Sequence, residues 1–169
     1  KFLIGELGEL NEIRHLLKSP KDVAKSVAAL QEENKQLKKE VEKLLAAQAG
    51  ALKGELLQKV EPINGLNFLG AKLPLDDSNA IKTLAYQLEE QIGNAVIVFG
   101  AEANGKAQLA VAISRELAES KGLHAGNMIR ELAKEIKGGG GGQPFFATAG
   151  GQDVGGLERA IARARDMVR

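Results

Sequence analysis

The N-terminal third of the chain carries apolar residues at helical spacing. Between residues 3 and 17 these residues share one helical face, at Leu7, Leu10, Ile13, Leu16 and Leu17, which predicts a short amphipathic helix. Ser19 as the N-cap and Pro20 as the first helical residue predict a second helix. We expect it to run from residue 20 to about residue 60, over roughly 60 Å at 1.5 Å per residue, and to end at Glu61-Pro62.

The second predicted helix contains a heptad repeat. Its core positions alternate in steps of three and four residues, and we expect them to form an oligomerisation surface: Val27, Leu30, Asn34, Leu37, Val41 and Leu44. Valine at position a, leucine at position d and one asparagine at position a favour two parallel strands in register. The alternative is an intramolecular hairpin, in which this stripe packs on the first helix of the same chain. The repeat is short, and both arrangements stay open.

From residue 63 onward the pattern changes to mixed strands and helices. Apolar runs predict strands over 66–73, 95–99, 107–113 and 145–149. Amphipathic spacing predicts helices over about 125–137 and from Asp153 to the end, and one more helix between the N-cap candidates Asp76-Asp77-Ser78 and the stop signal Gly93-Asn94. Asn104-Gly105 is a type I′ hairpin signal. We expect the five consecutive glycines at 138–142 to form a loop, and Gly150-Gly151 to lead into the last helix. The order β-α-β-β-α-β-α predicts an α+β module, a small mixed sheet covered by helices.

The glycine distribution marks a domain boundary. Only four of the 20 glycines precede Pro62, and we therefore expect a helical subdomain at residues 1–61 and a globular subdomain at residues 62–169. The chain begins with Lys1 and not with methionine, so we expect a piece cut from a longer protein.

Composition excludes several kinds of chemistry. The 23 Lys and Arg against 22 Asp and Glu give a net charge of +1, so any RNA contact must be local. The chain has no cysteine, and its two histidines, His15 and His124, are far apart in sequence, so we expect no thiol catalysis and no metal site. We identify no nucleophile, metal cluster or nucleotide-binding loop, and therefore expect no catalytic residue and no bound cofactor in this chain. No apolar run is long enough for a membrane span or a signal peptide, which favours a cytoplasmic protein.

The glycine run is the most informative candidate site. Ordering five glycines costs conformational entropy, but their bare backbone lets a ligand approach closely and lets N–H groups face an anion. Gly150-Gly151, before the last helix, adds a second such segment. The alternative is a flexible linker between helix and strand. The spacing fits neither a Walker A loop nor a GxGxxG fingerprint.

The stretch around these glycines resembles a known family. It reads Gly138–Gly142, Gln143, Pro144, Phe145-Phe146 and Ala147-Thr148-Ala149-Gly150-Gly151, and an amphipathic helix follows it. This order resembles the C-terminal domain of the bacterial alanyl-tRNA synthetases, and the resemblance covers essentially the whole chain. It implies a helical arm followed by a DHHA1-like globular module, the type also found in DHH-type phosphodiesterases.

The resemblance implies an accessory role in an alanine–tRNA ligase. The domain would bind the outer corner of tRNA-Ala, where the D- and T-loops meet, support aminoacylation and editing, and form a homodimer through its helical part. The catalytic and editing domains, with their ATP, Mg and Zn, would lie upstream as further partners. One alternative is the nucleic-acid-binding module of a DHH-type phosphodiesterase, in which a His usually takes the place of Gln143. Another is a coiled-coil element with a passive globular cap.

By the same resemblance we expect a tRNA-binding surface around the glycines. Its predicted residues are Lys137, Gly138, Gly139, Gly140, Gly141, Gly142, Gln143, Thr148, Gly150, Gly151, Arg159 and Arg163. Phe145 or Phe146 would stack on a base, and one of the two must point inward because they are adjacent on a strand. For these two arginines, together with Arg165 and Arg169 of the same helix, the alternative is a solvated surface with Glu158 and Asp166 as partners.

Overall fold

The computed structural model describes residues 2–18 and 21–169, which form two compact units, Lys1–Gly50 and Ala51–Arg169. The second unit begins before Pro62 because the last turns of the long helix pack into its core through Leu52, Leu56 and Leu57. The assignment of separate functions to residues 1–61 and 62–169 stays a prediction.

The N-terminal unit contains helix α1 (Phe2–Leu16) and most of helix α2 (Val23–Gln58). Helix α2 begins at Val23, because the Asp22 carboxylate accepts a hydrogen bond from the Lys25 N–H (3.0 Å) and so acts as the N-cap. The predicted cap at Ser19 and Pro20 lies outside the described residues. At 1.5 Å per residue α2 is about 54 Å long. None of the described helices combines the length and apolarity that a membrane span needs.

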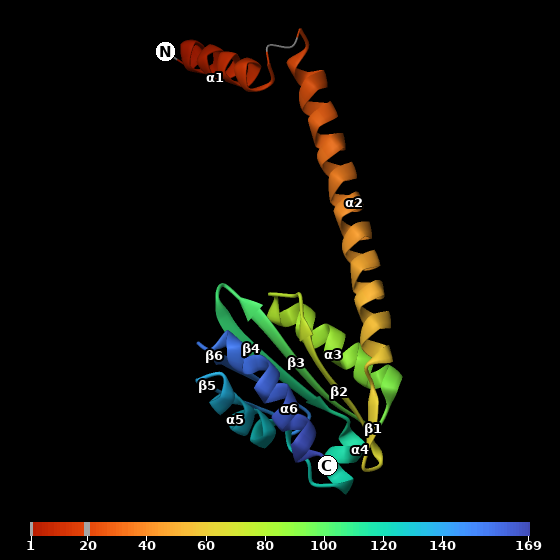
Figure 1. Cartoon of the computed structure of the whole chain (residues 1–169). Helices are drawn as coiled ribbons and strands as arrows, with labels where there is room; N and C mark the ends of the chain where they lie inside the picture. Colours follow the sequence, from red (N-terminus) through yellow and green to blue (C-terminus); the bar gives the residue numbers. More distant parts are fainter. Residues whose placement is uncertain (1, 19–20) are drawn as a thin grey trace. The chain divides into compact units, whose positions relative to one another are not determined.

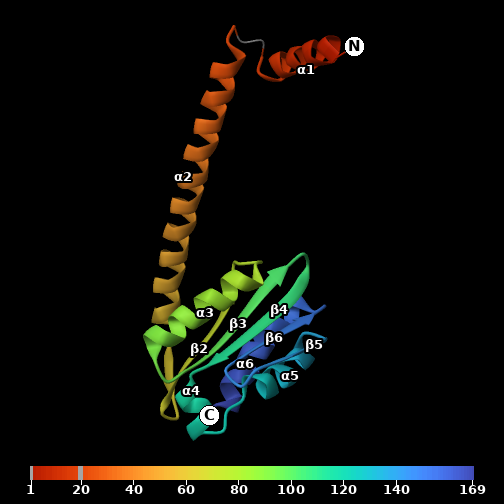
Figure 2. The same cartoon turned by 180° about the vertical axis from the view of Figure 1, so that it is seen from behind.

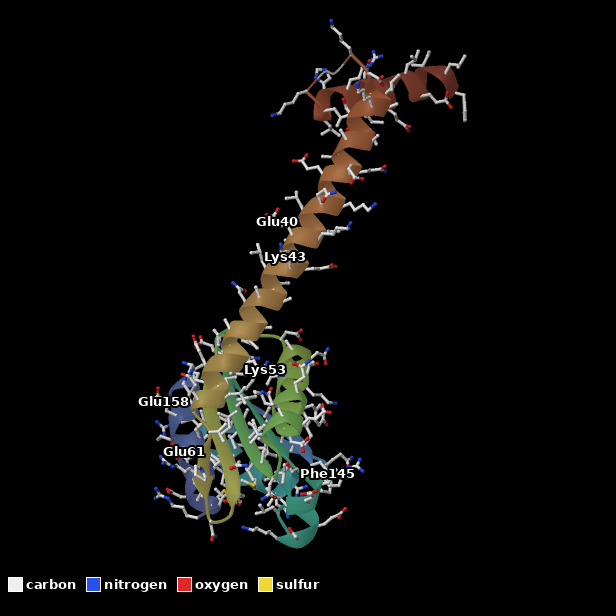
Figure 3. All side chains as sticks on the ribbon, turned by 90° about the vertical axis from the view of Figure 1, so that its right-hand side faces the viewer. Glu40, Lys43, Lys53, Glu61, Phe145 and Glu158 are labelled. Carbon is white, nitrogen blue, oxygen red and sulfur yellow. The ribbon has the colours of Figure 1, made fainter. Side chains whose placement is uncertain are left out.

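The heptad stripe of α2 is uncovered. Four of its predicted interface residues are more than half exposed: Leu30, Leu37, Val41 and Leu44. Glu40 and Lys43 project from the same helix (Figure 3), in keeping with the alternating charges of the sequence. Helix α1 does not cover the stripe, so the intramolecular hairpin is not formed within the described part of the chain.

The C-terminal unit is built on a six-stranded mixed sheet of order β1-β2-β3-β4-β6-β5. Its strands are β1 (Glu61–Ile63), β2 (Leu66–Leu73), β3 (Ala95–Ala103), β4 (Lys106–Ile113), β5 (Gly138–Gly142) and β6 (Phe146–Gly151). Helices α5 (Ala125–Glu135) and α6 (Leu157–Met167) cover one face (Figure 1), and α3 (Ser78–Ile92) lies on the other (Figure 2). The predicted α+β class is confirmed.

Local sequence signals set most of these elements. In β3, Val96 and Val98 pack under α5 and α6, whereas Ile97 and Phe99 pack under α3 and the end of α2, so both faces of this central strand are buried. The β3–β4 hairpin turns at Asn104-Gly105 with φ of 52° and 73°, as a type I′ turn requires. Asp77, one of the three N-cap candidates, caps α3, and His124 caps α5.

Three short features differ from the sequence prediction. Helix α4 (Arg115–Ser120) was not expected, and Glu61-Pro62 does not end a helix but opens strand β1. Proline is tolerated there because β1 is an edge strand. Gly150-Gly151 belongs to β6, and α6 starts later, after a 3-10 turn at Val154–Gly156.

The largest difference is the five-glycine run, which is strand β5 and not a loop. It pairs antiparallel with β6, from Gly138 opposite Gly151 to Gly142 opposite Ala147. Glycine is a poor strand former, but alternate positions here have no room for a side chain. A Cβ at Gly138, Gly140 or Gly142 would overlap the backbone of β6. The close approach of the two strands therefore requires glycine at these positions.

The backbone at the end of α5 also packs closely against the backbone of Gly151 and Gly156. A Cβ at Gly151 would overlap the Ile136 carbonyl oxygen, and one at Gly156 would overlap that of Glu135. The Asp153 N–H donates to the Ile136 carbonyl (2.9 Å), which satisfies one of the free acceptors at the helix end. The chain then turns directly into β5 through Lys137, with φ of 50°.

The steric difference between neighbouring glycines of β5 gives a stability test. We expect Gly140→Ala to lower the free energy of unfolding by about 1–3 kcal/mol or more, because its Cβ overlaps β6. Gly139→Ala meets open space at an ordinary φ and should be neutral or stabilising by up to about 1 kcal/mol. Denaturant unfolding of both variants measures the difference. Equal destabilisation by the two would contradict the described pairing of β5 with β6.

Candidate functional site

On the face of the sheet that α3 partly covers, two rows of side chains become smaller or more polar toward the β5 edge. The strand register defines one row across the sheet that reads Leu73, Ala101, Gln108, Gly150, Gly139, and a second that reads Ala71, Phe99, Ala110, Thr148, Gly141. In these two rows, large apolar side chains are confined to the inner strands, where α3 packs. The outer strands contribute only small or polar residues to the same rows. The fold thus brings Thr148 and three of the predicted glycines together on one surface.

A hollow of about 240 Å³ lies where α3 meets the outer strands. Ser78 and Ile81 of α3 form one wall, and Gln108, Ala110, Thr148 and Gly150 of β4 and β6 contribute to the floor. The Ser78 hydroxyl donates to the Gln108 side-chain oxygen at 3.2 Å. Figure 2 shows α3 on this side of the sheet, with β4, β6 and β5 extending beyond it. We call this hollow the α3 trough.

The bare edge of the sheet borders the α3 trough. Strand β5 has β6 on one side only, so its other side presents backbone N–H and C=O groups that no strand of the described residues pairs. Gly139 and Gly141 have open space where a side chain would stand. Lys137 and Gln143, at the two ends of β5, are exposed. This surface lets a ligand contact the backbone directly.

The two adjacent phenylalanines have different surroundings. Phe146 packs toward the core under α3, with its ring centroid 5.3 Å from that of Tyr86 and Lys82 Nζ 5.4 Å above it. It is the inward-pointing member of the pair. Phe145 is half-buried, and the Arg115 guanidinium carbon lies 5.2 Å from its ring centroid. Figure 3 shows Phe145 beside α4, on the other side of the module from Glu61.

The two predicted arginines lie elsewhere. Arg159 and Arg163 belong to α6, on the face of the sheet opposite to the α3 trough, and their partners are not Glu158 and Asp166. Arg163 pairs with Glu131 (3.2 Å) and Glu135 (2.7 Å) of α5, and Arg159 pairs with Asp153 (3.1 Å) and Glu135 (3.6 Å).

This network ties α6 to α5 and compensates the two positive charges. The hydrogen bond and charge of Lys134, and then the charge of Arg163, hold the pKa of Glu131 below its usual value. The structure therefore does not bring Arg159 and Arg163 to the glycine surface.

Two residues of the α3 trough were missed by sequence reasoning. Ser78 and Gln108 are neutral, belong to no motif and are far apart in the chain. Only the strand register, which sets Gln108 opposite Gly150, reveals them as part of the same surface. No local signal in the sequence identifies them.

Comparisons with known proteins identify the family to which this chain is similar. The DHHA1 domain model matches residues 65–169. Alanine–tRNA ligases match along the chain: that of Christiangramia forsetii is 47% identical over 169 residues, covering 100% of this chain and 19% of the ligase. That of Bacillus subtilis is 42% identical over 149 residues, covering 88% of this chain and 17% of the ligase. The chain thus spans about a fifth of the length of these curated relatives.

A solved structure shows the same fold for the C-terminal part of the chain. The C-Ala domain from Aquifex aeolicus alanyl-tRNA synthetase superposes with a TM-score of 0.60 at 22% sequence identity, covering 65% of this chain and 97% of that domain. The resemblance inferred from the glycine block is confirmed. On the match over residues 65–169, which is more than half of its length, the chain belongs to the DHHA1 domain family.

Proposed function

We propose that this chain is the tRNA-binding C-terminal part of an alanine–tRNA ligase. It would bind tRNA-Ala as an accessory to catalytic and editing domains elsewhere in the longer protein, and would itself carry no catalytic residue and no cofactor. The matches to alanine–tRNA ligases, which extend over the whole chain, support this role over that of a phosphodiesterase module. The proposal places the chain in the cytoplasm, where tRNA is aminoacylated.

The observation that carries the proposal is that the outer strands contain more glycines than packing requires. Gly138, Gly140 and Gly142 are required by packing, but Gly139, Gly141 and Gly150 meet open space at ordinary φ. Glycine inside a strand costs about 0.5–1 kcal/mol relative to alanine, so folding stability does not account for these three. A ligand that contacts bare backbone accounts for them.

The chemistry of this surface suits the sugar–phosphate backbone of RNA. The unpaired N–H groups of β5 can donate to phosphate oxygens, and the side chains of Lys137, Gln143 and Thr148 lie beside them. The net charge of +1 predicts modest affinity with a shallow salt dependence. Arg159 and Arg163 would contact only RNA that extends past the sheet edge, since they lie on the opposite face.

The proposed target on the RNA is the outer corner of tRNA-Ala, where the D- and T-loops meet. Loops expose unstacked nucleotides, which is where proteins most often recognise RNA. Contact at this corner would hold the tRNA while its acceptor end reaches the aminoacylation or the editing site. In this way the accessory domain would support both reactions.

The uncovered stripe of α2 supports a second part of the proposal, parallel self-association. Leu30, Leu37, Val41 and Leu44 are more than half exposed, and exposed apolar stripes at heptad spacing are covered by a second helix in coiled coils. Two copies would bury these residues and place Asn34 opposite its counterpart.

The glycine surface is tested by two substitutions that keep the fold. We expect Gly139→Val with Gly141→Val to weaken binding of tRNA-Ala at least about tenfold, or 1.4 kcal/mol, because the new side chains hold RNA away from the backbone. Both sites are open, so circular dichroism and thermal stability should be preserved. A gel shift or fluorescence titration measures the affinity.

Two controls accompany this variant. Lys35, Lys38 and Lys39 changed together to Gln should leave tRNA binding nearly unchanged, and a transcript without the D/T-loop corner should bind the original chain weakly. If the lysine changes abolish binding and the glycine changes do not, α2 is the RNA site and the assignment to β5 is wrong.

The association of α2 is tested by sedimentation of the chain. We expect a dimer at micromolar concentration, and Asn34→Val should raise the melting temperature while relaxing register or oligomeric state, because a polar core residue costs stability to specify pairing. A monomer at every accessible concentration, with helicity unchanged, would contradict the parallel pair.

A further inference from the structure

We propose that the α3 trough binds one unpaired nucleobase, turned out of its stack, while the bare strand β5 beside it carries the sugar–phosphate of the same RNA. The inference rests on the proposed function and deepens it by assigning a base site next to the backbone site.

The shape of the α3 trough suits a single flat ring system. Its volume of about 240 Å³ is below the roughly 300–1,000 Å³ typical of sites for drug-sized ligands. Ala110, Thr148 and Gly150 contribute no large side chain to the floor, and Ile81 and Phe99 supply apolar surface. At Gly150 a Cβ would meet nothing within 4 Å, so the absent side chain preserves the depth of the trough.

The polar groups of the trough match the edge of a base. The Gln108 side-chain oxygen accepts from the Ser78 hydroxyl at 3.2 Å, and its amide nitrogen has no protein hydrogen-bond partner among residues 2–18 and 21–169. The Thr148 hydroxyl is likewise without a partner in the described chain. Together they offer donors and acceptors side by side, which is how proteins read unstacked bases of RNA.

The same lining is unsuited to a phosphate group. None of the described residues that line the trough is charged. The nearby start of α3 is closed to an anion, because the Asp77 carboxylate already accepts from the Asn79 N–H at 3.0 Å. Lys82 is directed at the rings of Tyr86 and Phe146. A neutral heterocycle therefore fits this place better than an anion.

The register of β5 with β6 places the proposed backbone contact next to the proposed base site. Gly139 lies opposite Gly150, and Gly141 lies opposite Thr148. A nucleotide whose backbone follows β5 therefore has its base directed across β6 into the trough. This arrangement explains why open glycines stand on both strands.

The test is a titration of the whole 169-residue chain, followed by nuclear magnetic resonance, with the four ribonucleosides, ribose 5-phosphate and inorganic phosphate. We expect at least one nucleoside at millimolar concentration to shift the Gln108 side-chain amide and the Thr148 and Gly150 backbone amides, with ribose 5-phosphate and inorganic phosphate silent there. Gly150→Leu, which fills the trough, and Gln108→Ala should remove these shifts. Gly54→Leu, at another open glycine, should not.

The same variants are then compared in binding tRNA-Ala. We expect Gly150→Leu and Gln108→Ala to bind about 10- to 100-fold more weakly, in the range of one lost base-stacking contact, with Gly54→Leu unchanged. A response to phosphate but to no nucleoside would overturn the inference. So would full tRNA affinity in both trough variants when the Gly139→Val, Gly141→Val variant has lost it, and in that case the proposed function stands. If the original chain binds no tRNA, the proposed function fails, and the nucleoside titration alone decides the base site.

Discussion

The close packing of backbone against backbone around the end of α5 is the constraint on which the outer half of the sheet depends. The carbonyl oxygens of Glu135 and Ile136 leave no room for a Cβ at Gly156 and Gly151, respectively. Strand β5 lies so near β6 that alternate residues of β5 have no room for a Cβ either. Glycine loses more conformational entropy on folding than other residues, and here that loss is offset by strand pairing and a satisfied helix end. Without this packing β5 would be the flexible loop that its composition predicts.

The same constraint separates two kinds of glycine that look identical in the sequence. Gly138, Gly140 and Gly142 have no room for a Cβ beside β6 and are required for packing, whereas a Cβ at Gly139 or Gly141 would meet open space. The second kind lines an unpaired sheet edge and adjoins the α3 trough. Under the proposed function, the glycines required by packing and the bare backbone beside them together make this edge the place where RNA approaches most closely.

Most of the C-terminal unit could be predicted because its signals are local. Asp77, Gly93 and Asn104-Gly105 each act within a few residues and mark α3 and the β3–β4 turn correctly. Strand β5 could not, since its pairing with β6 overrides the poor strand propensity of glycine. Of the candidate site, the glycines and Thr148 were predictable from their motif. Gln108 and Ser78 were not, and the pairing of Arg159 and Arg163 with α5 depends on tertiary packing that spacing along α6 does not reveal.

Amide hydrogen exchange with and without tRNA-Ala tests the central claim most directly, because it reports where RNA covers the backbone. The outward N–H groups of β5 have no strand partner in the described chain and should exchange rapidly in the free protein. The account predicts that tRNA slows exchange across residues 137–151 and leaves the exposed parts of α2 and α6 unchanged. Protection confined to α2 or α6, with residues 137–151 unaffected, would contradict it.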